Sequence, residues 1–295
     1  MKITFRLLIV VLWFVTAGCN QEQTLKENEV FTIGLIPSQT EGEMQTAIDK
    51  LQALLSKELN RKVEITHYPA YNAVVEALNY SHIDMAFFGP LTYVIAHERS
   101  GAEAIITQLV DGEPYYYSYI ITHVDSKWET LDELLEDHDN VDFAFGSLSS
   151  TSGSLIPSVE LKNRGVYTSE DNHKFNSITF TGSHDVTGQS VLNKYVDAGA
   201  IDSAIFYSLV KSGKLNGEKI KVIWKSEKLF QYPWAVSPET GAETIVQLQD
   251  IFMGITDEEI LSPFGASGFT TASNEDYASL REAAIIDGRL DDDLD

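Results

Sequence analysis

The stretch Phe143-Ala144-Phe145-Gly146-Ser147-Leu148-Ser149-Ser150-Thr151-Ser152-Gly153 joins a short apolar run to a dense cluster of hydroxyl side chains. The apolar run predicts a buried strand ending at Gly146, and residues 155–164 can form the helix that follows. In such a turn the first N–H groups of the helix have no intrahelical partner, and the helix dipole is positive. Hydroxyl and N–H groups can therefore converge on a tetrahedral oxyanion without lysine or arginine. In the simpler interpretation, one hydroxyl caps the helix and the others fill the loop.

Strands and helices alternate on the N-terminal side of this turn. Apolar runs predict buried strands at residues 31–36, 63–68, 84–88 and 104–109. Apolar residues at helical spacing predict the intervening helices at residues 43–59, 71–79 and 91–99. Such alternation is typical of an α/β fold with a mostly parallel sheet and helices on both faces.

The pattern then restarts, which indicates a second α/β unit. Strands are expected at residues 116–122, 141–145, 177–180, 197–200 and 219–224. We expect the chain to cross between two lobes near Pro114 and again near Leu229. Lobe 1 would then comprise residues 30–116 and 229–295, and lobe 2 residues 117–228.

Three turns follow predicted strands and are candidates for one shared cleft. Ligands of open α/β sheets bind beyond the carboxyl ends of the strands. Gly89-Pro90, the hydroxyl turn and Gly182-Ser183-His184-Asp185 all lie at such ends. We therefore expect the ligand to bind between the lobes.

The N-terminus is typical of a targeting segment, so residues 1–18 are predicted to be a lipoprotein signal peptide. Lys2 and Arg6 precede an apolar run of 11 residues, which is too short for a membrane span of about 20 residues. The run ends in Thr16-Ala17-Gly18-Cys19, which resembles a bacterial lipoprotein box except at Thr16. We expect lipidation at Cys19, which would anchor the protein to the extracytoplasmic side of the cell membrane. The alternative is a plain secretory signal with an incidental cysteine.

Composition narrows the possible partners. Cys19 is the only cysteine, so no intramolecular disulfide is possible. Residues 19–29 are polar and predict a flexible tether. The formal net charge of −23 argues against nucleic acid as a partner. Residues 287–295 are rich in aspartate and predict a frayed, solvated tail.

Four motifs together resemble one known family. They are VVEALNYSHIDMAFFGPLTYVIA at residues 74–96, FGSLSSTSG at 145–153, TGSHD at 181–185 and VDAGA at 196–200. The chain resembles the substrate-binding lipoproteins of ABC importers for phosphonate, phosphite and related phosphate-like anions. The resemblance implies a two-lobed periplasmic-binding-protein fold of type II with the ligand in the cleft. It also implies capture without catalysis or cofactor, and delivery to a permease and ATPase complex.

Several side chains match the anion site of that family. The resemblance implies ligand contacts from Ser150, Thr151 and Ser152, from Tyr71 and Tyr116, and from His184, with Tyr93 a weaker candidate because family members vary there. Each side chain also has a plainer interpretation. Tyr71 could pack against the sheet, Tyr116 could pack at the hinge, and His184 could cap the following helix.

One departure from the family bears on the ligand. Members that bind an aminoalkyl phosphonate place acidic residues where this chain aligns Ala204 and Tyr232, and Asp202 is expected to lie one residue out of register. We therefore expect a ligand without an amine: phosphite, a small alkyl phosphonate or phosphate.

Four other functions are considered. Ser150, His184 and Asp185 include the residue types of a hydrolase triad, but the serine lacks a Gly-x-Ser-x-Gly elbow. The seven histidines are scattered without metal-ligand spacing, so no metal is expected. An aromatic cage for a cation could involve Trp224 and Trp234. Finally, an extracytoplasmic sensor of the same anions, acting through a membrane signalling partner, would use the same pocket.

Overall fold

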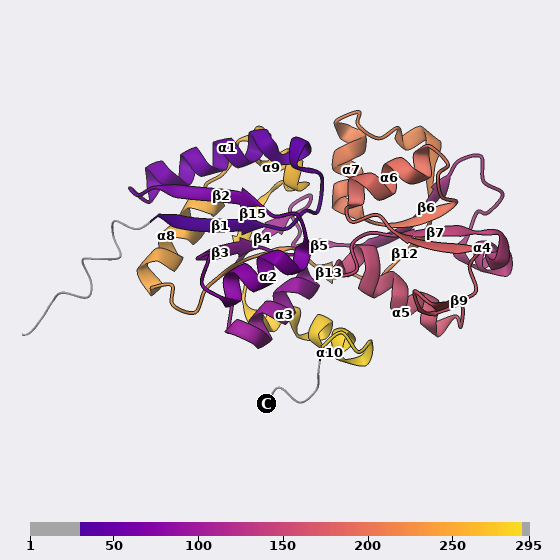
Figure 1. Ribbon diagram of the computed structural model, residues 1–295. Coiled ribbons are helices and arrows are strands. Elements are labelled where there is room, and N and C mark those ends of the chain that lie inside the picture. The colour runs from indigo at the N-terminus through magenta and orange to yellow at the C-terminus, as the bar shows by residue number, and fades with distance from the viewer. Residues whose placement is uncertain (1–29, 291–295) are drawn as a thin grey trace, which may run out of the picture.

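The computed structural model describes residues 30–290, and within that range the strands form two large sheets (Figure 1). The predicted signal peptide, Cys19 and the tether lie outside the described residues, as do residues 291–295. Among residues 30–290, no helix combines the length and the apolar character that a bilayer span requires.

The first lobe is built on a six-stranded sheet in the order β15-β4-β14-β3-β1-β2. Its strands are β1 (Phe31–Leu35), β2 (Val63–His67), β3 (Met85–Phe87), β4 (Glu103–Leu109), β14 (Pro233–Val236) and β15 (Gly268–Thr271). Its helices are α1 (Glu41–Glu58), α2 (Tyr71–Asn79), α3 (Pro90–Ser100), α8 (Ala242–Met253), α9 (Glu258–Leu261) and α10 (Ala278–Ile286), with short 3₁₀ turns at Ser262–Phe264 and Asn274–Tyr277.

The second lobe is built on a five-stranded sheet in the order β10-β7-β11-β6-β12. Its strands are β6 (Ser118–His123), β7 (Asp142–Phe145), β10 (Ser177–Phe180), β11 (Ala198–Asp202) and β12 (Ile220–Lys225), with a small hairpin of β8 (Tyr167–Ser169) and β9 (Asn172–His173). Its helices are α4 (Leu131–Glu136), α5 (Ile156–Asn163), α6 (His184–Leu192) and α7 (Ser203–Lys211), with 3₁₀ turns at His138–Asn140 and Gly217–Lys219.

Two short strands carry the chain between the sheets. β5 (Tyr115–Tyr116) pairs antiparallel with β13 (Leu229–Phe230), with Leu229 opposite Tyr116. The two crossings therefore lie side by side (Figure 1). The expected boundaries at 116/117 and 228/229 fall at these strands. A paired two-stranded connection of this kind can bend without breaking the sheet of either lobe.

Both sheets are mixed rather than wholly parallel. β1 runs parallel to β2 and β3, and β7 runs parallel to β10 and β11. β14 is antiparallel to β3 and β4, and β6 is antiparallel to β11 and β12. β6 and β14 are the first strands of their sheets after each crossing. Because the carboxyl ends of the parallel strands face the other lobe, a strand that begins at the crossing has to run the opposite way.

Each sheet is covered by apolar contacts on both faces. In β6, Ile120 packs into one core cluster of lobe 2, while Tyr119 and Ile121 pack into another. Successive side chains of a strand point to opposite faces, so every residue of this inner strand is buried. The rigid sheets hold the turns at their carboxyl ends in fixed positions, and the candidate site lies there.

Candidate functional site

The hydroxyl-rich loop folds back on itself between β7 and α5. Ser150 is the N-cap, and its side chain accepts a hydrogen bond from the Gly153 N–H at 3.1 Å. The following turn, Thr151–Leu155, is a π-helical turn in which the Leu155 N–H donates to the Ser150 carbonyl at 3.0 Å. The Gly146 N–H donates to the Gly153 carbonyl at 2.7 Å and closes the loop. We call residues 146–154 the anion loop.

The three predicted hydroxyls of the anion loop are buried but differ in their contacts. The Ser150 Oγ lies 3.4 Å from the His184 Nε2. The Thr151 hydroxyl accepts from the Leu91 N–H of α3 at 2.8 Å, so it links the two lobes. The Ser152 Oγ has no hydrogen-bond partner among the described residues. The loop therefore offers at least one free donor toward the interior.

Tyr71 and Tyr116 carry two further buried hydroxyls, and neither has a hydrogen-bond partner within residues 30–290. Burial raises the pKa of Tyr71, and the neighbouring Ser150 hydroxyl partly opposes this. Burial also raises the pKa of Tyr116, with Asp202 adding to the effect. Both tyrosines therefore stay protonated near neutral pH and can donate. Buried polar groups without partners are rare, so a cluster of them calls for an acceptor.

His184 is held as a neutral donor. Its Nδ1 accepts from the Asp202 backbone N–H at 3.2 Å, which places the hydrogen of the neutral ring on Nε2. That Nε2 lies 3.2 Å from the Tyr232 hydroxyl as well as near Ser150. Burial lowers the pKa of His184 to about 4, with Asp185 opposing the shift. The imidazole is therefore uncharged at neutral pH.

We call the side chains of Ser150, Thr151, Ser152, Tyr71, Tyr116 and His184 the hydroxyl cluster. Tyr93 lies apart from it. Its hydroxyl donates to the Asn274 side chain and accepts from the Ala104 N–H at 3.2 Å. Its ring packs edge-on against Tyr277, with the ring centroids 4.7 Å apart. Tyr93 is thus engaged within lobe 1, and the structure does not bring it to the other predicted residues.

Tyr232 and Asp202 also lie beside His184, although neither was expected to be a ligand contact. Tyr232 follows the return crossing, and its ring lies 5.4 Å from that of Tyr116. Asp202 ends β11, and its Oδ1 caps α7 by accepting from the N–H groups of Ala204 and Ile205 at 2.6 and 3.0 Å. Its side chain lines the cavity between the lobes. Its position at the end of a small-residue strand was the signal available in the sequence.

The Asp202 carboxyl is buried and only half satisfied, since Oδ2 has no partner among the described residues. Burial raises the pKa of Asp202 to about 7, and the hydrogen bonds from the Ile205 and Ala204 N–H groups oppose the shift, as does the neighbouring Tyr232 hydroxyl. The group therefore takes up or releases a proton close to physiological pH. A protonated carboxyl can donate to an anion, whereas an ionised one repels it.

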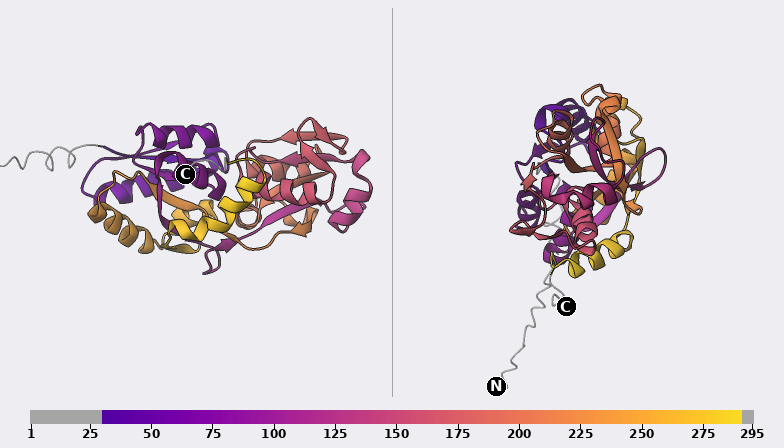
Figure 2. Two further views of the ribbon diagram at one scale, coloured as in Figure 1. Left: turned by 90° about the horizontal axis from the view of Figure 1, so that it is seen from below. Right: turned by 90° about the vertical axis from the view of Figure 1, so that its right-hand side faces the viewer.

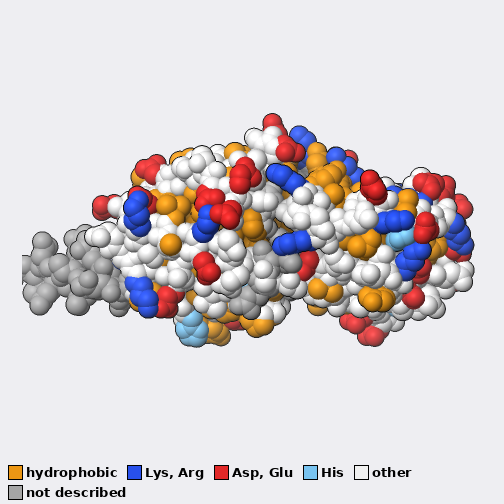
Figure 3. All heavy atoms as spheres, turned by 90° about the horizontal axis from the view of Figure 1, so that it is seen from above, with side chains coloured by type: hydrophobic (Ala, Val, Ile, Leu, Met, Phe, Trp, Pro, Cys, Tyr) orange, Lys and Arg blue, Asp and Glu red, His pale blue; other side chains and the backbone are white. Residues whose placement is uncertain are grey.

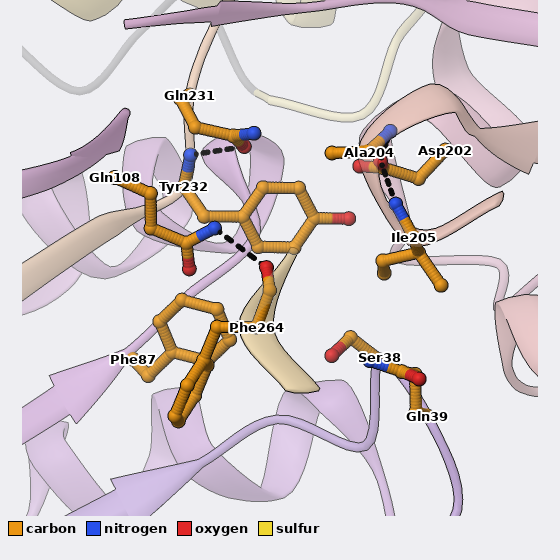
Figure 4. Close-up of a pocket in the computed structure, with 10 residues that line it drawn as sticks. All are labelled: Ser38, Gln39, Phe87, Gln108, Asp202, Ala204, Ile205, Gln231, Tyr232 and Phe264. Atoms are coloured by element: carbon orange, nitrogen blue, oxygen red, sulfur yellow. Dashed lines mark hydrogen bonds between the residues drawn. The ribbon is translucent and has the colours of Figure 1, made fainter. Parts of the chain in front are cut away.

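A small cavity adjoins the cluster and receives side chains from both lobes (Figure 4). Its volume is about 10 Å³, which leaves room for roughly one water molecule. The Tyr232 ring projects across it toward Asp202 and Ala204, with Ser38 and Gln108 on other sides (Figure 4). Tyr232 and Asp202 join this cavity to the hydroxyl cluster through their bonds to His184. A tetrahedral oxyanion is larger than a water molecule, so its entry requires the lobes to separate.

The lobes are closed over the site by several direct hydrogen bonds. The backbone N–H of His184 donates to the Ser38 carbonyl at 3.0 Å, and the backbone N–H of Thr40 donates to the Asp185 carboxylate at 3.2 Å. The Ser149 hydroxyl donates to the Asn72 side chain at 2.8 Å.

The surface seen from above carries acidic and basic side chains side by side rather than a basic patch (Figure 3). The donors of the site are hydroxyls and a neutral imidazole, which are buried between the lobes.

The geometry opposes a hydrolase triad. Because Nδ1 of His184 accepts a backbone N–H, its Nε2 carries the hydrogen and cannot take one from Ser150. The Asp185 carboxylate accepts from the Ser183 hydroxyl at 2.6 Å rather than orienting the imidazole.

The metal and cage alternatives gain no support either. Among residues 30–290, no group of three or more candidate ligand side chains is placed to bind a metal. Trp234 is buried in lobe 1, whereas Trp224 packs against a core of lobe 2.

A two-lobed α/β protein that closes over clustered neutral donors is a binding protein for a small anion. The family model described as "ABC transporter, phosphonate, periplasmic substrate-binding protein" matches residues 33–277. The chain belongs to this family, whose members are the substrate-binding components of ABC importers. The family resemblance and the two-lobed fold expected from the sequence are thereby confirmed.

Three known proteins illustrate the similarity. The "Phosphate-import protein PhnD" of Mycolicibacterium smegmatis is 29% identical over 231 residues, which cover 76% of this chain and 71% of that protein. The "Phosphonates-binding periplasmic protein" of Escherichia coli is 24% identical over 266 residues, covering 88% and 78%. The structure of PhnD1 from Prochlorococcus marinus in complex with methylphosphonate has a TM-score of 0.78 and 24% identity, covering 88% of this chain and 99% of that one. That structure supports the fold.

Proposed function

We propose that this protein captures a phosphorus oxyanion without an amine, namely phosphite, a small alkyl phosphonate or phosphate, and delivers it unchanged to a membrane permease and its ATPase. The observation that carries this proposal is a group of three buried hydroxyls without partners, those of Tyr71, Tyr116 and Ser152, in which Tyr116 neighbours both of the others. Ser150, Thr151 and the Nε2–H of His184 complete the set of donors.

Neutral donors suffice for such a ligand. Each hydrogen bond to a charged group contributes about 1.5–3 kcal/mol net. Five or six of them, after the cost of association, sustain binding of about −8 kcal/mol, which corresponds to a micromolar dissociation constant. Water is excluded once the lobes close, so every oxygen of the anion has to find a donor in the protein. Relatives are named for phosphate and for phosphonates, which share the tetrahedral oxyanion group.

The walls of the cavity favour a ligand without an amine. Ala204 and Tyr232 line it and supply no carboxylate. Asp202 is the acidic side chain among the lining residues, and its raised pKa makes it a poor partner for an ammonium group near neutral pH. A hydroxyl-bearing or methyl-bearing anion places no cation beside it.

Titration calorimetry with phosphite, methylphosphonate, phosphate and 2-aminoethylphosphonate tests this proposal on the chain beginning at Gln21, with sulfate as the matched oxyanion control. We expect one of the amine-free phosphorus anions to bind most tightly, and its ³¹P spectrum to be unchanged after incubation. Tightest binding of 2-aminoethylphosphonate would refute the amine-free site. Binding of none of the four would refute the assignment to phosphorus anions.

Lipid anchoring at Cys19 is a separate part of the proposal, supported by the apolar run and the lipoprotein box that precede it. Expression of the full chain in a bacterial host should give a membrane-bound product that incorporates radiolabelled palmitate. The Cys19→Ser variant should lose the label and be released from the membrane fraction. Unlabelled but secreted wild-type protein would indicate a plain signal peptide instead.

A further inference from the structure

The end of α10 forms a turn that directs Arg289 toward lobe 2. Gly288 has a φ of +71°, which favours glycine, and it ends the helix in a left-handed turn. The Arg289 N–H donates to the Ala284 carbonyl at 2.8 Å, and the Gly288 N–H donates to the Ile285 carbonyl at 2.9 Å. These two bonds are those of a Schellman cap, so the direction of Arg289 is fixed by the backbone. Residues 287–290 are thus ordered, and the sequence-based expectation of a frayed tail is wrong for them.

The Arg289 guanidinium contacts the anion loop and the start of α5. One of its terminal nitrogens donates to the Leu148 carbonyl and, at 3.0 Å, to the Ser154 hydroxyl. The other donates to the Ser158 hydroxyl at 3.1 Å. Leu148 and Ser154 flank the three hydroxyl residues 150–152 on either side. A planar fork of donors can hold several acceptors in one geometry, which a lysine cannot do.

An ion pair orients this guanidinium. The Asp287 carboxylate accepts from the Arg289 Nε at 2.8 Å and from the Lys162 Nζ of α5 at 2.6 Å. The Asp287 side chain is only 2% exposed and that of Arg289 16%, so solvent screens this pair weakly. Removing one member would leave the other charge buried without a partner.

The helix that carries Arg289 is fixed to lobe 1. Leu280, Ala284 and Leu290 are buried in the same core cluster as the strands of the first sheet. The Arg281 side chain also pairs with Glu98 of α3. In the ribbon diagram, α10 lies beneath α3 and reaches toward α5 (Figures 1 and 2). Arg289 therefore connects lobe 1 to the anion loop of lobe 2.

We propose that Arg289 is a positioning residue of the anion site, holding the anion loop in the conformation in which the hydroxyls of residues 150–152 face the interior. It acts without touching the ligand, through the Leu148 carbonyl and the Ser154 and Ser158 hydroxyls. Because its own helix belongs to lobe 1, it couples the order of the loop to the closed arrangement of the lobes. Its effect on affinity rests on the proposed function, whereas its effect on the loop does not.

Hydrogen exchange and ligand titration together test this role in the Arg289→Gln variant of the chain beginning at Gln21. In the ligand-free protein, backbone amides of residues 147–155 should exchange about tenfold faster than in the wild type, and those of β1 and β11 should be unchanged. Affinity for the tightest-binding amine-free anion should fall about tenfold or more, the scale of one lost charge-assisted hydrogen bond. Arg289→Lys should restore neither property fully, since one ammonium cannot reach all three acceptors.

Arg164→Gln is the matched control, because Arg164 lies at the other end of α5 and pairs with Glu160 and Asp132 on the surface. It should change neither loop exchange nor affinity. Should Arg289→Gln fail to fold, Ser158→Ala removes one acceptor of the same guanidinium and should give the same two effects at smaller size. Unchanged loop exchange, or faster exchange with unchanged affinity, would overturn the proposal. If the wild type binds no phosphorus anion, the proposed function fails, and the exchange measurement still decides whether Arg289 orders the loop.

Discussion

At the scale of single residues, the unpaired hydroxyls of the site lower the stability of the ligand-free protein but are available to bind a ligand. A buried hydroxyl without a partner costs about 1–3 kcal/mol of folding free energy. Tyr71, Tyr116 and Ser152 all carry such a group. The same groups are the donors available to an anion. Substitutions that remove them should therefore separate stability from binding.

We predict that Tyr116→Phe raises the free energy of unfolding of the ligand-free protein by about 1 kcal/mol and weakens anion binding about tenfold or more. Urea denaturation and titration calorimetry measure the two effects. Tyr277→Phe is the matched control for stability, because its hydroxyl donates to the Gln231 carbonyl at 2.8 Å and its loss should destabilise the fold. Tyr93→Phe should leave affinity unchanged. A destabilised Tyr116→Phe variant would mean that its hydroxyl has a partner in solution.

Asp202 should make the stability depend on pH. Its pKa is raised from 3.8 to about 7 in the folded protein. Its contribution to stability is therefore fully present below about pH 4 and is lost as the pH rises through 7. We predict that the unfolding free energy of the wild type, relative to Asp202→Asn, falls by up to about 1.4 kcal/mol per pH unit across this window.

Urea denaturation of both proteins at intervals from pH 4 to pH 7 measures this difference. Asparagine keeps the oxygen that caps α7, so the comparison isolates the titrating carboxyl. His184 contributes with the opposite sign, since its pKa is lowered from 6.5 to about 4 and its contribution is lost as the pH falls. That effect is common to both proteins and cancels. Parallel pH profiles would show that folding does not shift the pKa of Asp202.

At the scale of elements, the anion loop depends on two glycines that approach each other closely. A Cβ on Gly153 would lie 3.0 Å from both the Ser150 Oγ and the His184 Cε1, and 3.2 Å from the Cα of Gly146. The first two atoms belong to the site itself. The loop therefore has no room for a larger side chain at the point where its hydroxyls converge.

We predict that Gly153→Ala displaces Ser150 and His184 and reduces anion affinity by about tenfold or more, while destabilising the fold by about 1–3 kcal/mol through overpacking. Thermal denaturation and calorimetry check both effects. Gly42→Ala in α1 is the control, since a Cβ there meets nothing within 4 Å and alanine favours a helix. The loop would prove more adaptable than its contacts suggest if Gly153→Ala bound the anion as tightly as the wild type.

For the whole molecule, the charge of the chain opposes its ligand. The formal net charge is −23, so an approaching anion meets a repulsive field until it reaches the neutral donors between the lobes. Salt screens that field, because the Debye length falls from about 30 Å at 0.01 M to about 8 Å at 0.15 M. The site thus gains its affinity locally, against the long-range field.

We predict that the association rate of the anion rises with ionic strength, measured by stopped-flow fluorescence in sodium chloride. Trp234 is a suitable reporter, because it packs on Phe87, which stacks on Tyr232. Sucrose at equal osmolarity should not reproduce the increase. A rate that falls with salt would show that a local positive field guides the anion despite the net charge.

What the sequence by itself determined was local. The alternation of strands and helices, the restart after residue 116, and the hydroxyl turn after Phe145 all follow from side-chain periodicity and from turn chemistry. Ser150, Ser152, Tyr71, Tyr116 and His184 could be named because their positions match motifs of a known family. The shared edge at which parallel strands end brings the hydroxyl turn and the His184 turn together.

Tertiary structure alone decided which distant residues meet. The reversed directions of β6 and β14 come from the point at which the chain enters each sheet after a crossing. The hydrogen bond between Tyr93 and Asn274 joins α3 to a segment far along the chain. The placement of Asp202 and Tyr232 beside His184, and of Arg289 behind the anion loop, joins residues far apart in the chain. The spacing of residues along the chain does not predict such contacts. They form because burying these groups between two packed lobes lowers the free energy of the folded protein.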